Sequence, residues 1–329
     1  MTDQNQIGTK RSSKRRGRGC LLWLGGGLAV LLGLALVGYI YEPLAEAADA
    51  KAYPPPGELV DVGGYRLHIH CTGTGSPTVV IEAGLGDWST SWGGVVQPEV
   101  AKTTRVCTYD RAGLGWSDAA PGPSDAAQFA KELHTLLQNA NVPGPYVMVG
   151  HSLGGLIVRV FAHDYASEVA GVVLVDSMNP KQVTESLSNK LALFSSMEAA
   201  LARVGAARLI MKLPAIASST QPGEEAYYPL FSRPGSFQTT AKEYKSLPAS
   251  AAESAAVMSF GDLPLIVLTA KRNTNPGWPE WQTELLELSS NSQHLFAENS
   301  GHVIQSDEPT AAVDAILKMV ELVRQSMQN

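Results

Sequence analysis

The chain has 329 residues, 44% of them hydrophobic and 17% charged, with a formal net charge of −6. This length allows one large domain or two smaller ones, and the hydrophobic content is sufficient for a sizeable core. Residues 1–19 carry six basic side chains and one acidic side chain, a balance of +5 that leaves −11 for the rest. So acidic a body argues against nucleic acid as a partner.

A long uncharged segment follows the basic head. Residues 20–41 are 22 residues without a charge, which is long enough to cross a bilayer as a helix. The basic flank predicts that residues 1–19 are cytoplasmic and that everything after residue 41 is extracytoplasmic. We therefore expect a transmembrane anchor, with the membrane as a partner. The alternative is a cleaved signal peptide, because Ala45-Glu46-Ala47 fits a cleavage site, and the body would then be secreted.

Residues 42–57 predict a linker. They are rich in alanine and polar residues and end in Pro54-Pro55-Pro56-Gly57, a composition typical of a semi-rigid spacer. From residue 58 to residue 329, strand-like runs alternate with helical ones. This alternation favours one α/β domain with a mostly parallel sheet that is covered on both faces.

Two β-branched runs in the first half of this domain precede glycine-rich loops. Residues 78–82 predict a buried strand that leads into Ala83-Gly84-Leu85-Gly86, and residues 104–109 predict a second strand that leads into residues 110–117. These two strand–loop pairs, together with motifs later in the chain, carry a resemblance to a known family.

The most informative motif is Gly150-His151-Ser152-Leu153-Gly154. It stands between a predicted strand over residues 146–149 and a helical run that begins at residue 155. G-x-S-x-G between a strand and a helix is typical of a nucleophile elbow, in which the serine Oγ stands above the sheet. The motif alone is weak, so its context must support it.

The next strand is followed by a long insertion. Residues 171–175 predict a strand that ends at Asp176, and residues 177–262 are too many for an ordinary loop. Residues 191–213 and 241–258 have helical spacing, with Pro248 expected to kink or split the second run. We expect a helical cap. Its large side chains either line an acyl pocket or form the cap's own core: Met197, Leu201, Leu209, Met211, Tyr227, Tyr228 and Phe231.

In the last part of the chain, residues 264–268 and 295–298 predict two more strands. Asn273 lies in the loop after the first, and Asn299-Ser300-Gly301-His302 follows the second. Together with the loop after residue 82 and the elbow, these segments resemble the α/β hydrolase family, in the order that this family has. The resemblance runs from about Gly57 to the C-terminus. It implies the α/β hydrolase fold, with the cap inserted between the family's sixth and seventh strands at about residues 177–262.

The resemblance also implies roles for individual residues. Ser152 is the expected nucleophile, and His302 is the expected general base, since an imidazole can take the serine proton and return it to the leaving group. Two backbone N–H groups, those of Leu85 and Leu153, are the expected oxyanion hole. Haloalkane dehalogenases and epoxide hydrolases use aspartate at the nucleophile position, so a serine there points away from both reactions.

The acid that completes a triad with Ser152 and His302 is harder to identify from the sequence. Many family members place an acid after the seventh strand, where this chain has Asn273, which cannot be an anion. A subset places it after the sixth strand, where this chain has Asp176. We expect Asp176 to orient His302 and stabilise its imidazolium; the alternative is a structural cap of the loop. Glu280 and Glu284 are outside candidates.

The cysteines and histidines suggest no metal or other cofactor, because no spacing is typical of a zinc site. His68 and His70 are expected to be ordinary strand residues. The resemblance places Cys71 and Cys107 on neighbouring strands, and an exported domain permits a disulfide between them. We expect two free thiols instead, because the geometry of a cross-strand bridge is demanding.

The sequence thus predicts a serine hydrolase that cleaves a small-molecule carboxylic ester through an acyl-enzyme. Two alternatives stay open. The same triad runs acyl transfer and the cleavage of thioesters, amides and peptides, and a non-catalytic binding protein can keep the same fold.

Overall fold

The computed structural model describes residues 13–213 and 225–328. In this part of the chain, eight strands form one sheet in the order β1-β2-β4-β3-β5-β6-β7-β8. Their bounds are β1 Glu58–Asp61, β2 Arg66–Thr72, β3 Thr78–Glu82, β4 Val106–Tyr109, β5 Tyr146–His151, β6 Val169–Val175, β7 Leu265–Ala270 and β8 Ser292–Ala297. The pairs from β4 to β8 are parallel, and β1–β2 and β2–β4 are antiparallel. The mostly parallel sheet predicted from sequence is present.

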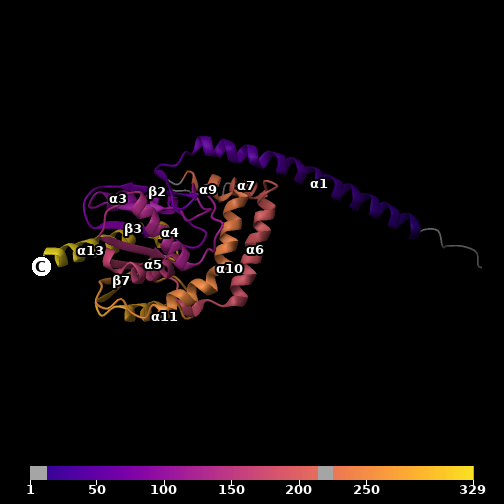
Figure 1. The fold of residues 1–329 in the computed structure, drawn as a ribbon. Coiled ribbons are helices and arrows are strands. Elements are labelled where there is room, and N and C mark those ends of the chain that lie inside the picture. The colour runs from indigo at the N-terminus through magenta and orange to yellow at the C-terminus, as the bar shows by residue number, and fades with distance from the viewer. Residues whose placement is uncertain (1–12, 214–224, 329) are drawn as a thin grey trace, which may run out of the picture.

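Helices cover both faces of this sheet (Figure 1). On one face, α4 (Ala126–Asn139) and α5 (Leu153–Asp164) pack against the strands, together with α11 (Trp278–Leu285). On the other face lie α2 (Thr90–Gly93), α3 (Val96–Ala101), α12 (Ile304–Asp307) and α13 (Pro309–Gln328). The buried strands are continuous apolar runs, as expected for strands covered on both sides.

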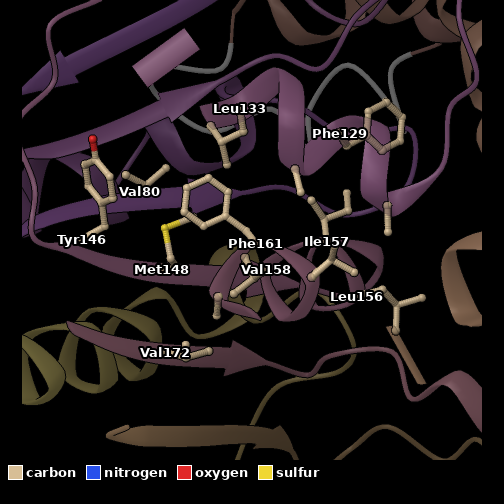
Figure 2. Packing of buried hydrophobic residues seen from close by; sticks show 14 of the residues in the cluster. Val80, Phe129, Leu133, Tyr146, Met148, Leu156, Ile157, Val158, Phe161 and Val172 are labelled. Atoms are coloured by element: carbon tan, nitrogen blue, oxygen red, sulfur yellow. The ribbon is translucent and has the colours of Figure 1, made fainter. Parts of the chain in front are cut away.

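The core between α4, α5 and the sheet is built from large side chains (Figure 2). Asp125 accepts a hydrogen bond from the backbone N–H of Gln128 and so caps the start of α4. Leu133 of α4, Phe161 of α5 and Met148 of β5 are fully buried and belong to the same hydrophobic cluster. This packing holds the start of α5 against the end of β5, where the serine motif lies.

The insertion between β6 and β7 contains four described α-helices. These are α6 (Glu185–Ala202), α7 (Ala206–Met211), α9 (Tyr227–Phe231) and α10 (Pro234–Ala256). Three sequence predictions need correction here. The helical run predicted over residues 191–213 is two helices, because α6 ends at Ala202 and α7 begins at Ala206, after Gly205 with its positive φ of 74°. The second long helix begins at residue 234, before the predicted residue 241, and Pro248 lies inside it without splitting it. Leu247 and Ala251 are buried against the main core, and we attribute the continuity of α10 to this packing, which offsets the loss of one backbone hydrogen bond.

The first helix is longer than the sequence predicted. Helix α1 runs over Ser13–Ala52, so most of the predicted linker over residues 42–57 is helical, and that prediction was wrong for residues 42–52. Glu42 is buried because it pairs with Arg208 of α7, which fixes this end of α1 to the body. The helix over residues 23–52 is long and apolar enough to cross a membrane by length and composition, with a mean hydropathy of 2.0 in an 18-residue window.

Cys71 and Cys107 form a disulfide between β2 and β4. The expectation of two free thiols was therefore wrong. The two residues are direct partners in the antiparallel ladder, with Cα atoms 4.0 Å apart. The register of the strands, which the sequence alone did not supply, brings the two side chains face to face.

Candidate active site

Ser152 lies in the sharp turn between β5 and α5. Its φ of 52° is positive, a conformation that costs a non-glycine residue free energy and that is common at functional sites. The flanking glycines are required by space. A Cβ on Gly150 would lie 2.6 Å from the carbonyl oxygen of Gly154, and one on Gly154 would lie 2.4 Å from the carbonyl oxygen of Glu82. The predicted elbow is therefore present.

The structure brings together the three side chains predicted from three distant segments. Ser152 donates its hydroxyl hydrogen to Nε2 of His302, at 3.0 Å. His302 Nδ1 donates to Oδ2 of Asp176 at 2.7 Å, and the carboxylate can only accept, so Nδ1 must carry the proton. Nε2 is then left with a lone pair directed at the serine hydroxyl.

Asp176 is fully buried and holds four hydrogen bonds. Its Oδ1 accepts from the backbone N–H of Ala270 at 2.9 Å and from Trp278 Nε1 at 2.8 Å. Its Oδ2 accepts from His302 and from Nδ2 of Asn273, the latter at 2.8 Å. Because all four partners donate, both carboxylate oxygens are engaged and the side chain is fixed in one orientation. Asp176 itself has a φ of 39°, so the backbone is strained at both Ser152 and Asp176.

Sequence reasoning missed Asn273 and Trp278 as partners of Asp176. The position of Asn273, where many relatives carry the acid, was the available signal. The outside candidates for the acid do not reach the site. Glu284 pairs with Lys181 and accepts from Asn179, and no contact joins Glu280 to His302.

His151, next to the serine, is fully buried and supports the loop of His302. Its Nε2 donates to the carbonyl oxygen of His302 at 2.9 Å, and its Nδ1 accepts from Gln305. Burial, with a smaller contribution from the nearby His302, lowers the pKa of His151 to about 4. His151 is therefore neutral near pH 7 and holds the backbone of the late histidine in place.

The loop after β3, which contains Leu85, is held by charged side chains that are themselves buried. Arg111 donates to the carbonyl oxygens of Ala83 and Gly84. The backbone N–H of Gly86 donates to Oε2 of Glu243, a residue of the cap helix α10, at 2.7 Å.

Arg111 remains charged in this buried place. Burial opposes its charge, but the carboxylates of Glu243 and Glu82 outweigh this effect and raise the pKa of Arg111 above its ordinary value. Leu85 itself lines the cavity above the serine. Leu153 opens α5, and N–H groups in the first turn of a helix have no carbonyl partner within that helix.

A cavity of about 480 Å³ lies over the serine. Ser152 and His302 open into it from the sheet side, and Tyr227, Tyr228 and Tyr244 line it from the cap. Among the residues that the structure describes, no group of three or more His, Cys, Asp and Glu side chains could hold a metal ion.

The other cap residues expected in an acyl pocket lie elsewhere. Met197, Leu201 and Leu209 are exposed on the outside of the cap. Met211 lines a separate surface depression beside α1. Phe231 packs between aromatic side chains of the cap and Trp88 of the body. Of the seven candidates, Tyr227 and Tyr228 line the cavity, so the acyl-pocket alternative holds for these two residues alone.

Comparison with known proteins agrees with this architecture. A sequence model of the alpha/beta hydrolase fold matches residues 77–255. The uncharacterised protein YqjL of Bacillus subtilis is 28% identical over 263 residues, which are 75% of this chain and 85% of that protein. The chain spans 18% and 53% of two other curated relatives, a probable transporter of Hormonema carpetanum and an uncharacterised protein of Schizosaccharomyces pombe.

Solved structures share the fold. An esterase from Thermogutta terrifontis is 20% identical with a TM-score of 0.64, over 80% of this chain and 97% of that one. A putative acyltransferase from Salmonella enterica is 19% identical with a TM-score of 0.64, over 81% of this chain and 95% of that one. At this identity the likeness shows the fold alone, and one fold serves several acyl-transfer reactions.

Proposed function

Since this chain belongs to the alpha/beta hydrolase family, we propose that it is a serine hydrolase that cleaves a carboxylic ester through an acyl-enzyme on Ser152. The observation that carries the proposal is the unbroken hydrogen-bonded series from Asp176 through His302 to Ser152. This series ends in the cavity that the cap covers. Hydrolysis of acyl compounds needs such a base-activated alcohol, held where a carbonyl carbon can reach it.

In the acylation step, Ser152 Oγ forms a bond to the carbonyl carbon while its proton moves to Nε2 of His302. The imidazolium that results is stabilised by the carboxylate of Asp176, which stays ionised. The tetrahedral intermediate then expels the alcohol, which takes the proton from Nε2, and the acyl group remains on Ser152. A water molecule repeats the same steps and releases the carboxylic acid.

The negative oxygen of the intermediate needs hydrogen-bond donors. We assign this role to the backbone N–H groups of Leu85 and Leu153, because one lies on the loop after β3 and the other opens α5 directly after the serine. The hydrogen bonds of Arg111 and Glu243 to the backbone of residues 83–86 support this assignment. These bonds hold the loop in one conformation before any substrate enters.

The catalytic domain is assigned to residues 58–329, with the cap at about residues 177–262, and α1 is assigned as a membrane anchor. The basic residues before the span favour an extracytoplasmic catalytic domain. The disulfide between Cys71 and Cys107 supports this side, because disulfides persist in oxidising compartments. Cleavage as a signal peptide is the alternative, and an N-terminus near Ala48 in the mature protein would establish it.

One experiment separates the ester hydrolase from its alternatives. The full chain in detergent is treated with a fluorophosphonate probe and with p-nitrophenyl esters of increasing chain length, with and without an added alcohol. Labelling at Ser152 together with ester hydrolysis supports the proposal. Preferential transfer of the acyl group to the alcohol would make the protein an acyltransferase, and absence of both labelling and turnover would make it a binding protein.

A further inference from the structure

The outside of the cap carries large exposed hydrophobic side chains, and we call this surface the cap face. It consists of Leu187, Leu193, Phe194, Met197 and Leu201 of α6, Leu209 and Ile210 of α7, and Leu213 just after α7. In the part of the chain that the structure describes, twelve large hydrophobic residues outside α1 are exposed, and eight of them are these. Single exposed apolar residues are normal, but a cluster of this size indicates an interaction surface.

The amphipathicity of α6 is inverted relative to a helix of a soluble domain. Its buried residues are small, namely Ser188, Ser195, Ala199 and Ala202, and they face α10. Its large apolar residues, except the half-buried Leu191, face outward. A helix in water is expected to bury its large apolar side chains instead. Small residues between closely packed helices, with large apolar residues outside, are typical of helices in contact with lipid.

The position of α1 relative to the cap face indicates that a membrane covers this surface. Gly38 of α1 lies against the backbone of Val204, where an added Cβ would come within 2.0 Å of the carbonyl oxygen. Arg208 of α7 forms ion pairs with Glu42 and Asp49 of α1. The end of the uncharged segment is therefore fixed beside the junction of α6 and α7.

This attachment sets the level of the bilayer. Residues 20–41 are uncharged and Glu42 is the first acidic residue after them, so the membrane that α1 enters must begin close to Glu42. Leu209 directly follows Arg208, the partner of Glu42, and is 71% exposed. Figure 1 shows α6 on the outer side of the cap, on the side from which the free part of α1 projects, whereas the C-terminus lies on the opposite side.

Charge agrees with a lipid surface. The groove between α6 and α10 is lined by apolar and polar residues and by three basic ones, Arg203, Lys242 and Lys245, without an acidic one. The body of the chain is otherwise acidic. Basic side chains beside an apolar helix face are typical of proteins that lie on anionic bilayers.

We propose that the cap face inserts into the headgroup and upper acyl region of the same membrane that α1 crosses, with Arg203, Lys242 and Lys245 against anionic headgroups. The cap is then held on the membrane at two places, by α1 and by the cap face. The cavity over Ser152 lies between the sheet and this membrane-bound cap. The inference rests on α1 as an anchor but does not require any particular activity at Ser152.

The test uses the full chain with Cys20→Ser, reconstituted into vesicles of phosphatidylcholine and phosphatidylglycerol that carry a nitroxide on one acyl chain. Single cysteines at Phe194→Cys and Leu209→Cys carry an environment-sensitive fluorophore. Val30→Cys within α1 reports insertion of the anchor. Met327→Cys, which is exposed near the C-terminus, reports the side of the body that faces away from the membrane.

We expect the labels at 194 and 209 to be quenched at least about fivefold more than the label at 327, since an interfacial helix places its apolar side chains among the acyl chains. Quenching at 194 should weaken in vesicles of phosphatidylcholine alone. If the label at 30 is quenched while 194 and 209 behave like 327, the anchor stands and the inference is wrong. If the labels are not quenched and the same variants, left unlabelled and treated with a mild oxidant, form disulfide-linked pairs of copies, the cap face is an interface between copies and the inference is wrong. An unquenched label at 30 would overturn both the anchor and the inference.

Discussion

Glu243 accepts a hydrogen bond from the backbone N–H of Gly86 at 2.7 Å. The two residues are 157 positions apart, one on the cap helix α10 and the other on the loop after β3. The second carboxylate oxygen of Glu243 accepts from Arg111 Nε at 2.7 Å, and Arg111 in turn holds two carbonyl groups of the same loop. The cap is therefore part of the structure that positions the expected oxyanion donor Leu85.

Removing this charge is expected to affect both stability and turnover. In Glu243→Gln, the amide can accept only one of the two hydrogen bonds, and Arg111 keeps a buried charge with one carboxylate fewer. We expect a loss of about 3 kcal/mol in the free energy of unfolding and a fall in kcat of about tenfold with little change in KM, because a displaced donor acts on the transition state. Urea denaturation and ester kinetics measure the two effects.

Glu185→Gln, at the exposed start of α6, is the matched control and should change neither quantity. If Glu243→Gln lost stability but retained the kcat of the parent, Glu243 would be a structural residue only.

Ser152→Ala is expected to abolish fluorophosphonate labelling and to lower kcat by about 10⁴-fold or more. The side chain contributes a hydroxyl and little packing, so the melting temperature should stay close to that of the parent. Labelling at another serine in this variant would place the nucleophile elsewhere.

Asp176→Asn is expected to lower kcat by about 10⁴-fold, since an amide cannot stabilise the imidazolium of His302 and favours the wrong tautomer. Asn273→Ala is the matched comparison. It removes a single donor to Asp176 while three others remain, so we expect a decrease of no more than about tenfold. Equal losses in the two variants would contradict the assignment of Asp176 as the essential acid.

The buried His151 predicts a pH dependence of stability. Its pKa is about 4 in the folded chain, against an ordinary value of 6.5. Between these two pH values His151 is therefore protonated in the unfolded chain and neutral in the folded chain. Its contribution to stability is present above about pH 6.5 and falls, by up to about 3 kcal/mol, as the pH drops towards 4. In His151→Gln this part of the pH dependence should vanish. Urea denaturation of both proteins at about pH 7 and about pH 4.5 measures how much free energy of unfolding each loses between the two pH values. An equal loss in the parent and in His151→Gln would show that His151 is not the group responsible.

The disulfide between Cys71 and Cys107 closes a loop between residues 36 positions apart. Replacing both cysteines with alanine is expected to lower the free energy of unfolding by about 4 kcal/mol, because the unfolded chain regains the entropy of that loop. Cys20→Ser leaves the bridge intact and should have no such effect. Two free thiols in protein isolated without reductant would contradict the bridge.

The sequence by itself determined those features that depend on local patterns. Strand β3 has the bounds that the β-branched run over residues 78–82 predicted, and the elbow lies where the glycine spacing around Ser152 placed it. The uncharged segment over residues 20–41 was likewise evident from composition. These signals are local because a strand, a tight turn and an apolar helix each depend on neighbouring residues.

Other features were decided by the tertiary structure, because they depend on which distant residues meet. The register of β2 and β4 makes Cys71 and Cys107 partners, and the packing of Arg208 against Glu42 turns a predicted linker into a helix fixed to the body. The pairing of Asp176 with His302 was expected from the family resemblance, but the order of strands in the sheet is what brings the two side chains together across 126 positions. The outward orientation of Met197 and Leu209, which the sequence analysis assigned to a pocket or to the cap's own core, depends on which face of each helix the rest of the cap covers. No local pattern contains that information.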